Sequence, residues 1–309
     1  MADKKASRIV RVSLIQQGPM TNDIDRNKED LLKKVEEVAE KEHPDFLMGI
    51  ELSTTQYFCS VCDEMYFDLA EPIPGPTTEL FAEVAKKYEM CLLLGIFEKT
   101  NVEDVYYDSV VVLGPDGQII EGIMPDGTKV LRYVKNHIPY LPLNPLNYNE
   151  RFYFKEGFGF PVFHTPKAKI GIVVCFDRRF SESFKMATLQ GAEIVFNPAN
   201  CFVHGPQRGA AAEIMYLAEL QTRALESSVW VCATNKAGTE DVQGQLTTFY
   251  GSSSIIHPTG EIAVKAPRSE PAVISHDLDL EEVSMARRFL PLYEARRPEL
   301  YTLICRPIQ

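Results

Sequence analysis

The segment Lys-Ile-Gly-Ile-Val-Val-Cys-Phe-Asp-Arg-Arg, residues 169–179, carries the pattern that decides the fold. Residues 169–174 are predicted to form a strand, because the run is largely apolar, as in a strand covered by helices on both faces. Cys175 stands at the carboxyl end of this strand, and a helix is predicted over 181–190. Open α/β sheets hold their ligands at such strand ends, so the segment predicts both a layered α/β fold and a site.

Segments of the same kind recur on both sides of it. Residues 26–42 and 78–90 carry apolar side chains at helical spacing, and 91–97 is an almost wholly apolar strand. A long helix is predicted over 210–226. Strand–helix units alternate with hairpins and no change in composition marks a linker, so we expect one mixed α/β domain over residues 1–309.

Composition and charge narrow the class of protein. The 309 residues include 32 Lys and Arg against 43 Asp and Glu, a formal net charge of −11, and 45% are hydrophobic. This is the mix of an ordinary globular protein. The acidic balance argues against nucleic acid or an anionic membrane as partner, because phosphate binding needs clustered Lys and Arg. We expect a small-molecule substrate instead.

The sequence shows neither a membrane span nor a secretory signal. No apolar run reaches the roughly 18 residues that a span requires, and no apolar stretch follows the two lysines near the N-terminus. We therefore expect a cytoplasmic protein.

The chain has seven cysteines, an odd number that does not suit a disulfide framework, so we expect reduced thiols. Cys59 and Cys62 have CxxC spacing, but no second pair or histidine partner completes a metal site. The six histidines show no HExxH spacing. We expect neither a metal nor an organic cofactor.

Two charged residues occupy the same kind of position as Cys175. Glu51 follows the apolar run 46–50, and Lys135 follows the predicted strand 128–134. Taken singly, each has an ordinary interpretation as a capping glutamate, a surface lysine or a small buried thiol. Together they have a mechanism: a carboxylate takes the thiol proton, the thiolate attacks a carbonyl or nitrile carbon, and the ammonium balances the oxyanion.

The chain resembles the nitrilase, or carbon–nitrogen hydrolase, superfamily along nearly its whole length. The segments that carry the resemblance are Gln-Gln-Gly-Pro at 16–19, the run ending in Glu51, 72–76, Val-Lys-Asn-His-Ile-Pro at 134–139, Glu-Arg-Phe-Tyr-Phe-Lys-Glu-Gly at 150–157, 172–179, Gly-Ala-Glu-Ile at 191–194 with Asn197 and Pro198, and Pro-Thr-Gly-Glu at 258–261. The order and spacing of so many segments make the resemblance specific. It implies a four-layer α-β-β-α sandwich.

The same resemblance implies roles for individual residues. The reacting set would be Glu51 as general base, Lys135 as oxyanion partner, Cys175 as nucleophile and Glu150 as a second, orienting glutamate. The N–H of Phe176 would complete the oxyanion hole. Two departures are that Ile50 stands where the family usually has proline, and that there is extra length around 124–128, from which we expect a changed rim of the pocket.

Within the superfamily, residues 175–179, the opening segment and Arg297-Pro298 are most similar to N-carbamoyl-D-amino-acid amidohydrolases. This similarity implies that Arg178 and Arg179 bind the α-carboxylate of the substrate, which a guanidinium grips bidentately. It also implies that Asn200 hydrogen-bonds the substrate. The two arginines would in addition favour a thiolate at Cys175.

The arginines also have a purely structural interpretation, as salt bridges to Asp177 or Glu182 at a helix start. Phe176 stands where those amidohydrolases have a polar Asn, which makes the pocket beside the nucleophile more apolar.

The reacting residues predict a cysteine-dependent amidohydrolase, and the resemblance implies that it cleaves the carbamoyl C–N bond of N-carbamoyl amino acids, of D configuration, to amino acid, ammonia and carbon dioxide. A β-ureidopropionase, an N-carbamoylputrescine amidase, an aliphatic amidase and a nitrilase would use the same reacting residues and stay open. A non-catalytic scaffold on this fold is the alternative of another class. The resemblance further implies a homo-oligomer, dimer or tetramer, with residues 280–309 involved in assembly.

Overall fold

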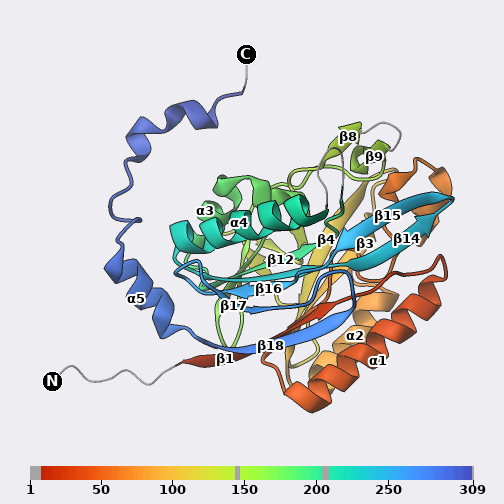
Figure 1. The fold of residues 1–309 in the computed structure, drawn as a ribbon, viewed down its shortest axis with the longest axis horizontal. Coiled ribbons are helices and arrows are strands. Elements are labelled where there is room, and N and C mark those ends of the chain that lie inside the picture. The colour runs from red at the N-terminus through yellow and green to blue at the C-terminus, as the bar shows by residue number, and fades with distance from the viewer. Residues whose placement is uncertain (1–7, 143–146, 204–208, 308–309) are drawn as a thin grey trace.

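The computed structural model describes residues 8–142, 147–203 and 209–307, and its elements stack in four layers (Figure 1). Two layers of helices enclose two β-sheets, which confirms the predicted α-β-β-α sandwich. In the described part of the chain the α-helices are α1 (Ile24–Glu42), α2 (Pro76–Lys87), α3 (Ser181–Leu189), α4 (Gly209–Ser227) and α5 (Glu281–Phe289).

The first sheet has six strands in the order β18-β1-β2-β3-β4-β7. Their bounds are β1 (Ile9–Gln16), β2 (Phe46–Met48), β3 (Cys91–Lys99), β4 (Tyr106–Leu113), β7 (Tyr133–Val134) and β18 (Ala272–Asp279). Strands β1, β2 and β3 run parallel because α1 and α2 form the crossovers between them. Their carboxyl ends therefore lie at one edge of the sheet.

The second sheet has eight strands in the order β17-β16-β13-β12-β11-β10-β5-β6. Their bounds are β5 (Gly122–Ile123), β6 (Lys129–Val130), β10 (Val162–His164), β11 (Lys169–Ile172), β12 (Ile194–Ala199), β13 (Trp230–Asn235), β16 (Ser254–Ile256) and β17 (Ile262–Lys265). Here too the central strands β11, β12 and β13 are parallel, with α3 and α4 as crossovers.

Two hairpins stand outside the large sheets. One pairs β14 (Ala237–Val242) with β15 (Gln245–Tyr250), and the other pairs β8 (Tyr140–Pro142) with β9 (Asn147–Asn149). The second lies in a stretch, 138–161, whose proline and aromatic content predicts irregular structure. Local strand pairing in this stretch was therefore missed.

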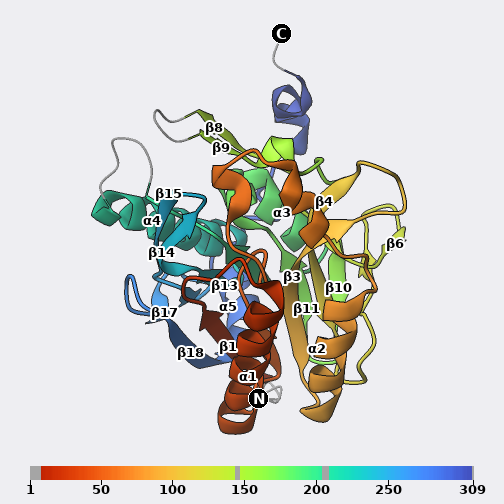
Figure 2. The same cartoon turned by 90° about the vertical axis from the view of Figure 1, so that its right-hand side faces the viewer.

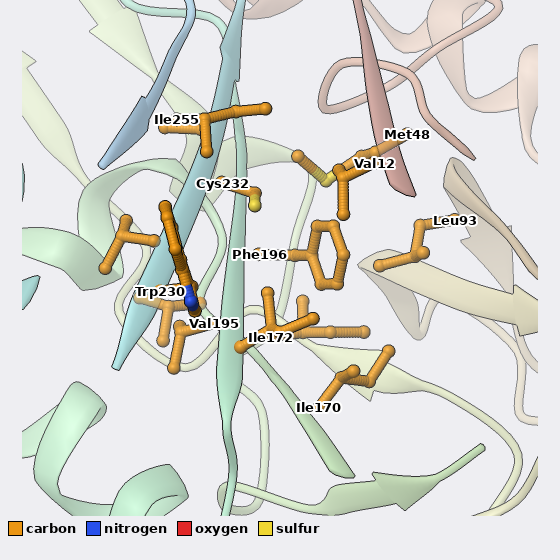
Figure 3. Packing of buried hydrophobic residues seen from close by; sticks show 14 of the residues in the cluster. Val12, Met48, Leu93, Ile170, Ile172, Val195, Phe196, Trp230, Cys232 and Ile255 are labelled. Atoms are coloured by element: carbon orange, nitrogen blue, oxygen red, sulfur yellow. The ribbon is translucent and has the colours of Figure 1, made fainter. Parts of the chain in front are cut away.

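The two sheets pack face to face on an apolar core. Phe196 of β12 points toward Val12, Met48 and Leu93 of the first sheet (Figure 3). The ring of Phe196 also lies 5.6 Å from that of Phe46. Each side chain buried in this way contributes about 1.5–3 kcal/mol, so the interface between the sheets is a main source of stability.

The helices cover the outer faces of the sheets. Helices α1 and α2 lie side by side on one face of the molecule (Figure 2), and their apolar side chains pack on the first sheet. Helices α3 and α4 pack on β11 and β13 of the second sheet. The sheets are thereby shielded on both faces, while the strand ends stay free to form a site.

The chain leaves the sandwich after β18. Helix α5 is anchored to the sandwich by the buried Val283, and with the short 3₁₀ segments η5 (Pro298–Leu300) and η6 (Thr302–Cys305) it forms an arm whose end extends away from the layers (Figure 1). Apolar side chains on this arm are exposed, including Phe289, Leu303 and Ile304. We expected this region, 280–309, to take part in assembly; residues 308–309 lie outside the described residues.

None of the helices in the described ranges combines the length and the apolar character of a membrane span.

Candidate active site

The predicted reacting residues come from distant parts of the chain and meet at one edge of the sandwich. They are Glu51 in the turn after β2, Lys135 directly after β7, Glu150 at the start of the 3₁₀ segment η3 (Glu150–Phe152), and Cys175 at the start of η4 (Cys175–Arg179). Strand β2 ends at Met48, earlier than the predicted run 46–50, and a turn over residues 51–54 follows. Glu51 is therefore held by a turn instead of by the strand itself.

Two of these turns have an unusual backbone conformation. Cys175 has a φ of 42°, and Leu52, next to Glu51, has a φ of 48°. Such angles cost about 1–3 kcal/mol in a residue other than glycine, so the surrounding structure has to hold them. Gly95 of β3 leaves the space for the second turn, since a Cβ there would lie 2.7 Å from the carbonyl oxygen of Ile50.

The ammonium of Lys135 is fully buried among three carboxylates. Its Nζ lies 2.6 Å from Oε1 of Glu51 and 3.3 Å from Oδ2 of Asp108, and it also contacts Glu150. The carboxylate oxygens lie within 4.8 Å of one another, a spacing that also suits a metal ion. In this structure the lysine supplies the positive charge that they share.

One of the three carboxyl groups has to keep its proton, because one ammonium cannot compensate three buried negative charges. Glu51 accepts hydrogen bonds from Lys135 and from the N–H of Asn200. Glu150 accepts from Lys135 and from the hydroxyl of Tyr57. Asp108 accepts no well-aligned hydrogen bond from the described residues. The proton is therefore best placed on Asp108.

The acid–base properties of the cluster agree with this assignment. Burial, followed by the charge of Glu51, raises the pKa of Asp108 well above its ordinary value. Burial opposes ionisation of Glu51 as well, but the charge of Lys135 and hydrogen bonds, one of them from Asp108, leave the pKa of Glu51 lowered. Burial raises the pKa of Glu150 to about 7. Burial disfavours the charge of Lys135, yet Glu150 and Glu51 raise its pKa well above the usual value.

Cys175 faces a second thiol, Cys201, which the sequence did not single out. The two Sγ atoms are 4.0 Å apart, and Nη1 of Arg178 lies 3.1 Å from Sγ of Cys201. Burial opposes ionisation of Cys201, but the hydrogen bond from Cys175 and the charge of Arg178 lower its pKa to about 6. The hydrogen bond to Cys201, together with burial, raises the pKa of Cys175. Arg178 thus stabilises negative charge mainly on Cys201 and to a lesser degree on Cys175.

Arg178 and Arg179 share a carboxylate on α4. Nε of Arg178 lies 3.0 Å from Oε2 of Glu219, and Nη1 of Arg179 lies 2.6 Å from Oε1. The structural interpretation of the arginines as salt-bridging residues is correct, but the predicted partners, Asp177 and Glu182, are not. The true partner comes from the packing of α4 against η4, which no local spacing reveals. Both arginines also line the cavity beside Cys175.

Asn200 has two roles open to it. Its side-chain Nδ2 donates a hydrogen bond to the backbone oxygen of Glu51, and its backbone N–H donates one to Oε2 of Glu51. Both bonds are 2.8 Å long. Asn200 therefore positions the predicted base. Its Oδ1 is buried without a hydrogen-bond partner among the described residues, and Asn200 lines the cavity. The predicted hydrogen bond from Asn200 to a substrate stays a prediction.

A cavity of about 210 Å³ opens onto Cys175 and Glu150. Its polar lining comes from the residues described above. Its wider wall is apolar or aromatic and consists of Tyr57, Pro139, Leu141, Tyr148, Phe176, Phe202, Met215 and Tyr250. A pocket with such a wall and a few converging polar groups suits a small ligand with one reactive polar end.

Three residues of the site were missed from sequence, and two of them carried a signal. Asp108 directly precedes the predicted strand 109–113 and lies within β4, and Cys201 follows a buried strand as Cys175 does. Glu219 sits in the helix α4 among several other glutamates, and nothing in its spacing distinguishes it.

The chain belongs to the carbon-nitrogen hydrolase family, whose family model matches residues 11–288. It is a hydrolase that acts on carbon–nitrogen bonds other than peptide bonds. The N-carbamoylputrescine amidase of Solanum lycopersicum is 32% identical to it over 98% of this chain and 97% of the relative. The citrullinase of Francisella tularensis is 30% identical over 96% of this chain and 98% of the relative.

Among solved structures, the carbon-nitrogen hydrolase from Helicobacter pylori superposes with a TM-score of 0.87 at 25% identity, covering 97% of this chain and 100% of that one. These comparisons confirm the superfamily and the fold. They do not show the finer prediction of an N-carbamoyl-D-amino-acid amidohydrolase, since the two relatives are named for other substrates.

Proposed function

We propose that this protein is a cysteine amidohydrolase that removes the carbamoyl group from N-carbamoyl amino acids. The observation that carries the proposal is the joint position of Cys175 and two arginines on one small cavity, with the buried pair of Lys135 and Glu51 behind the thiol. When the carbamoyl carbon of the substrate lies at the thiol, the other end of the substrate would lie beside the basic wall of the cavity, formed by Arg178 and Arg179.

The cycle begins when Glu51 takes the proton of Cys175, with which it shares a hydrogen bond. The thiolate attacks the carbamoyl carbon, and Lys135 together with the N–H of Phe176 stabilises the oxyanion. Glu51 returns the proton to the departing ammonia and then activates water, which cleaves the thioester-like intermediate. The carbamic acid released loses carbon dioxide and leaves the free amino acid. Glu150 orients Lys135 during these steps.

The basic wall favours a substrate with a carboxylate. Two guanidinium groups share the single carboxylate of Glu219, and the Cys201 thiolate beside Arg178 is the other negative charge at the cavity. Arg179 is the more accessible of the two, with 26% of its side chain exposed against 3% for Arg178. A substrate carboxylate would therefore be bound mainly by Arg179, while Arg178 holds the wall together. The preference for the D configuration rests on the similarity of residues 175–179 alone.

A second candidate substrate is an N-carbamoyl amine with a positive charge. The relative from Solanum lycopersicum is named for N-carbamoylputrescine, and Glu219, the acidic partner of both arginines, could exchange one of them for a substrate ammonium. This binding mode costs more here, because an arginine would have to leave a charge-assisted pair.

Ammonia release from a substrate panel tests these assignments. The panel contains N-carbamoyl-D-amino acids, their L enantiomers, N-carbamoyl-β-amino acids, citrulline, N-carbamoylputrescine and simple amides, each assayed with the wild type and with Cys175→Ala. We expect the carboxylate-bearing carbamoyl compounds to react fastest and the variant to be inactive. Fastest release from N-carbamoylputrescine would establish the second candidate. Equal rates for wild type and Cys175→Ala would overturn the proposed nucleophile.

A further inference from the structure

The thiols of Cys175 and Cys201 stand at corresponding ends of neighbouring strands. Strands β11 and β12 are parallel and pair Ile172 with Phe196, and each cysteine follows the carboxyl end of its strand. Neighbouring strands lie about 4.8 Å apart, a backbone separation that suits a disulfide between residues just beyond them. The sulfurs already lie 4.0 Å apart.

The surroundings of the pair make one sulfur nucleophilic. Nη1 of Arg178 lies 3.1 Å from Sγ of Cys201, and a guanidinium at this distance stabilises a thiolate. The thiolate character of Cys201 is supported by its lowered pKa of about 6. Both sulfurs line the cavity, so a small oxidant that enters the cavity meets them directly.

The catalytic cycle proposed above uses only one of these thiols. Cys201 has no part in it and even competes with Glu51 for the proton of Cys175. A second, ionised thiol in contact with a nucleophilic thiol is the arrangement of a redox-sensitive pair.

We propose that Cys175 and Cys201 form a reversible disulfide when a hydroperoxide reacts in the cavity. The Cys201 thiolate attacks one peroxide oxygen, the O–O bond breaks, and the sulfenic acid of Cys201 forms with release of hydroxide or alkoxide. The sulfur of Cys175 then attacks the sulfur of the sulfenic acid, the S–O bond breaks, and the thiol proton leaves with the hydroxyl group as water. Two sulfurs are oxidised by two electrons in total, and one peroxide is reduced.

The bond requires a modest movement. The S–S distance of a disulfide is about 2.05 Å, so the sulfurs have to approach by roughly 2 Å, which side-chain rotation at either cysteine supplies. The disulfide removes the nucleophile Cys175 from catalysis and protects Cys201, because a sulfenic acid without a partner thiol is oxidised irreversibly to the sulfinic acid. A dithiol reductant returns both thiols by exchange.

Mass spectrometry of the full chain tests the inference without any assay substrate, so its result is independent of the proposed function. Wild type, Cys201→Ser and the control Cys62→Ser, in which an exposed cysteine is replaced, are treated with hydrogen peroxide, alkylated and digested. For wild type and Cys62→Ser we expect a loss of two alkylatable thiols, a linked pair of peptides containing Cys175 and Cys201, and full recovery after dithiothreitol. For Cys201→Ser, which lacks the thiolate that reacts with the peroxide, we expect no linked peptides and a Cys175 thiol that is still alkylated.

Circular dichroism of each variant establishes that it is folded before oxidation. If Cys201→Ser fails to fold, Arg178→Lys takes its place. The lysine ammonium keeps the positive charge but loses the contact of the guanidinium with Sγ of Cys201. We therefore expect the linked peptides to form more slowly in this variant. Wild type in which Cys175 gains oxygen without forming the linked peptides would overturn the inference, as would a linkage of Cys175 to any other cysteine.

Discussion

Nζ of Lys135 lies 2.6 Å from Oε1 of Glu51, although 84 positions separate the two residues in the chain. Both side chains are fully buried, and the contact exists because β7 of the first sheet and the turn after β2 end at the same edge. A buried ion pair of this kind is stable only if further groups satisfy both partners. Glu150, Asp108 and Asn200 are those groups.

Replacing Lys135 by methionine removes the positive charge of the cluster. We expect loss of activity and a decrease of about 3–5 kcal/mol in the free energy of unfolding, because buried carboxylates lose their partner. Urea unfolding followed by circular dichroism measures the change. The control is Lys129→Met, which removes an ion pair between exposed side chains with Glu121 and should leave the stability nearly unchanged. Equal stability of Lys135→Met and wild type would contradict the buried charge cluster.

Asp108 is expected to act as a neutral positioning residue that donates a hydrogen bond to Glu51. Asp108→Asn keeps a donor of the same shape and should retain most of the kcat. Asp108→Leu removes the donor, so the pKa of Glu51 should rise and the acidic limb of the kcat/KM profile should move to higher pH. The pH profiles of the three proteins are the measurement. If the asparagine variant is as impaired as the leucine variant, Asp108 acts as an anion and the assignment of its proton is wrong.

The two arginines should differ when replaced. Arg179→Ala removes the accessible guanidinium, and we expect KM for carboxylate-bearing substrates to rise on the order of tenfold, as for a lost hydrogen bond between charged groups. Arg178→Ala should also destabilise the fold, since Glu219 and Cys201 lose a buried partner. Comparing KM for a carbamoyl amino acid with KM for an uncharged amide reports the effect on carboxylate binding, and urea unfolding reports the effect on stability. A parallel rise of both KM values in Arg179→Ala would argue against a carboxylate contact.

Cys201 should make the stability of the protein depend on pH. Its pKa of about 6 lies below the ordinary thiol value of 9.0, so the folded state binds this proton less tightly than the unfolded state. The resulting stabilisation is complete above pH 9.0 and is lost as the pH falls through about 6. The free energy of unfolding, measured with urea across this pH range, should rise with pH in the wild type and in Cys62→Ser. In Cys201→Ser the rise should be smaller. If the thiolate absorbance of Cys201 titrates near pH 9.0, the ordinary thiol value, the ion pair with Arg178 is contradicted.

The arm that follows β18 is expected to hold an oligomer together. Leu303 is 75% exposed and Ile304 65% exposed, and apolar side chains in such positions are typical of contacts with a second copy. Leu303→Asp combined with Ile304→Asp should lower the mass measured by light scattering without changing the circular dichroism spectrum. Thr302→Asp, which adds charge at an exposed polar position of the same segment, is the control. A wild-type protein that is monomeric at all concentrations would contradict the predicted assembly.

The sequence predicted much of the site because three of the four reacting residues follow a recognisable strand. Glu51, Lys135 and Cys175 stand after apolar runs, and parallel strands with helical crossovers bring such ends to one edge. The positions of Glu150 and Asn200 came only with the resemblance to the superfamily. Their proposed roles in the reaction stay predictions.

The contacts around these residues were not predictable in the same way. The alternative interpretation, in which Arg178 and Arg179 form salt bridges within their own segment, named the wrong partners because Glu219 approaches from α4. Asp108 and Cys201 precede or follow apolar runs as visibly as the predicted residues do, but their function becomes apparent only beside Lys135 and Arg178.

By itself, the sequence determined the layered α/β fold, the superfamily and the residues at the strand ends, because the periodicity of apolar residues and the order of motifs are properties of the chain alone. Tertiary structure decided which carboxyl group keeps a proton, which thiol carries the charge and which acid the arginines bind. Those properties depend on burial and on distances of a few ångströms between segments far apart in the chain, and such distances arise only when the layers pack.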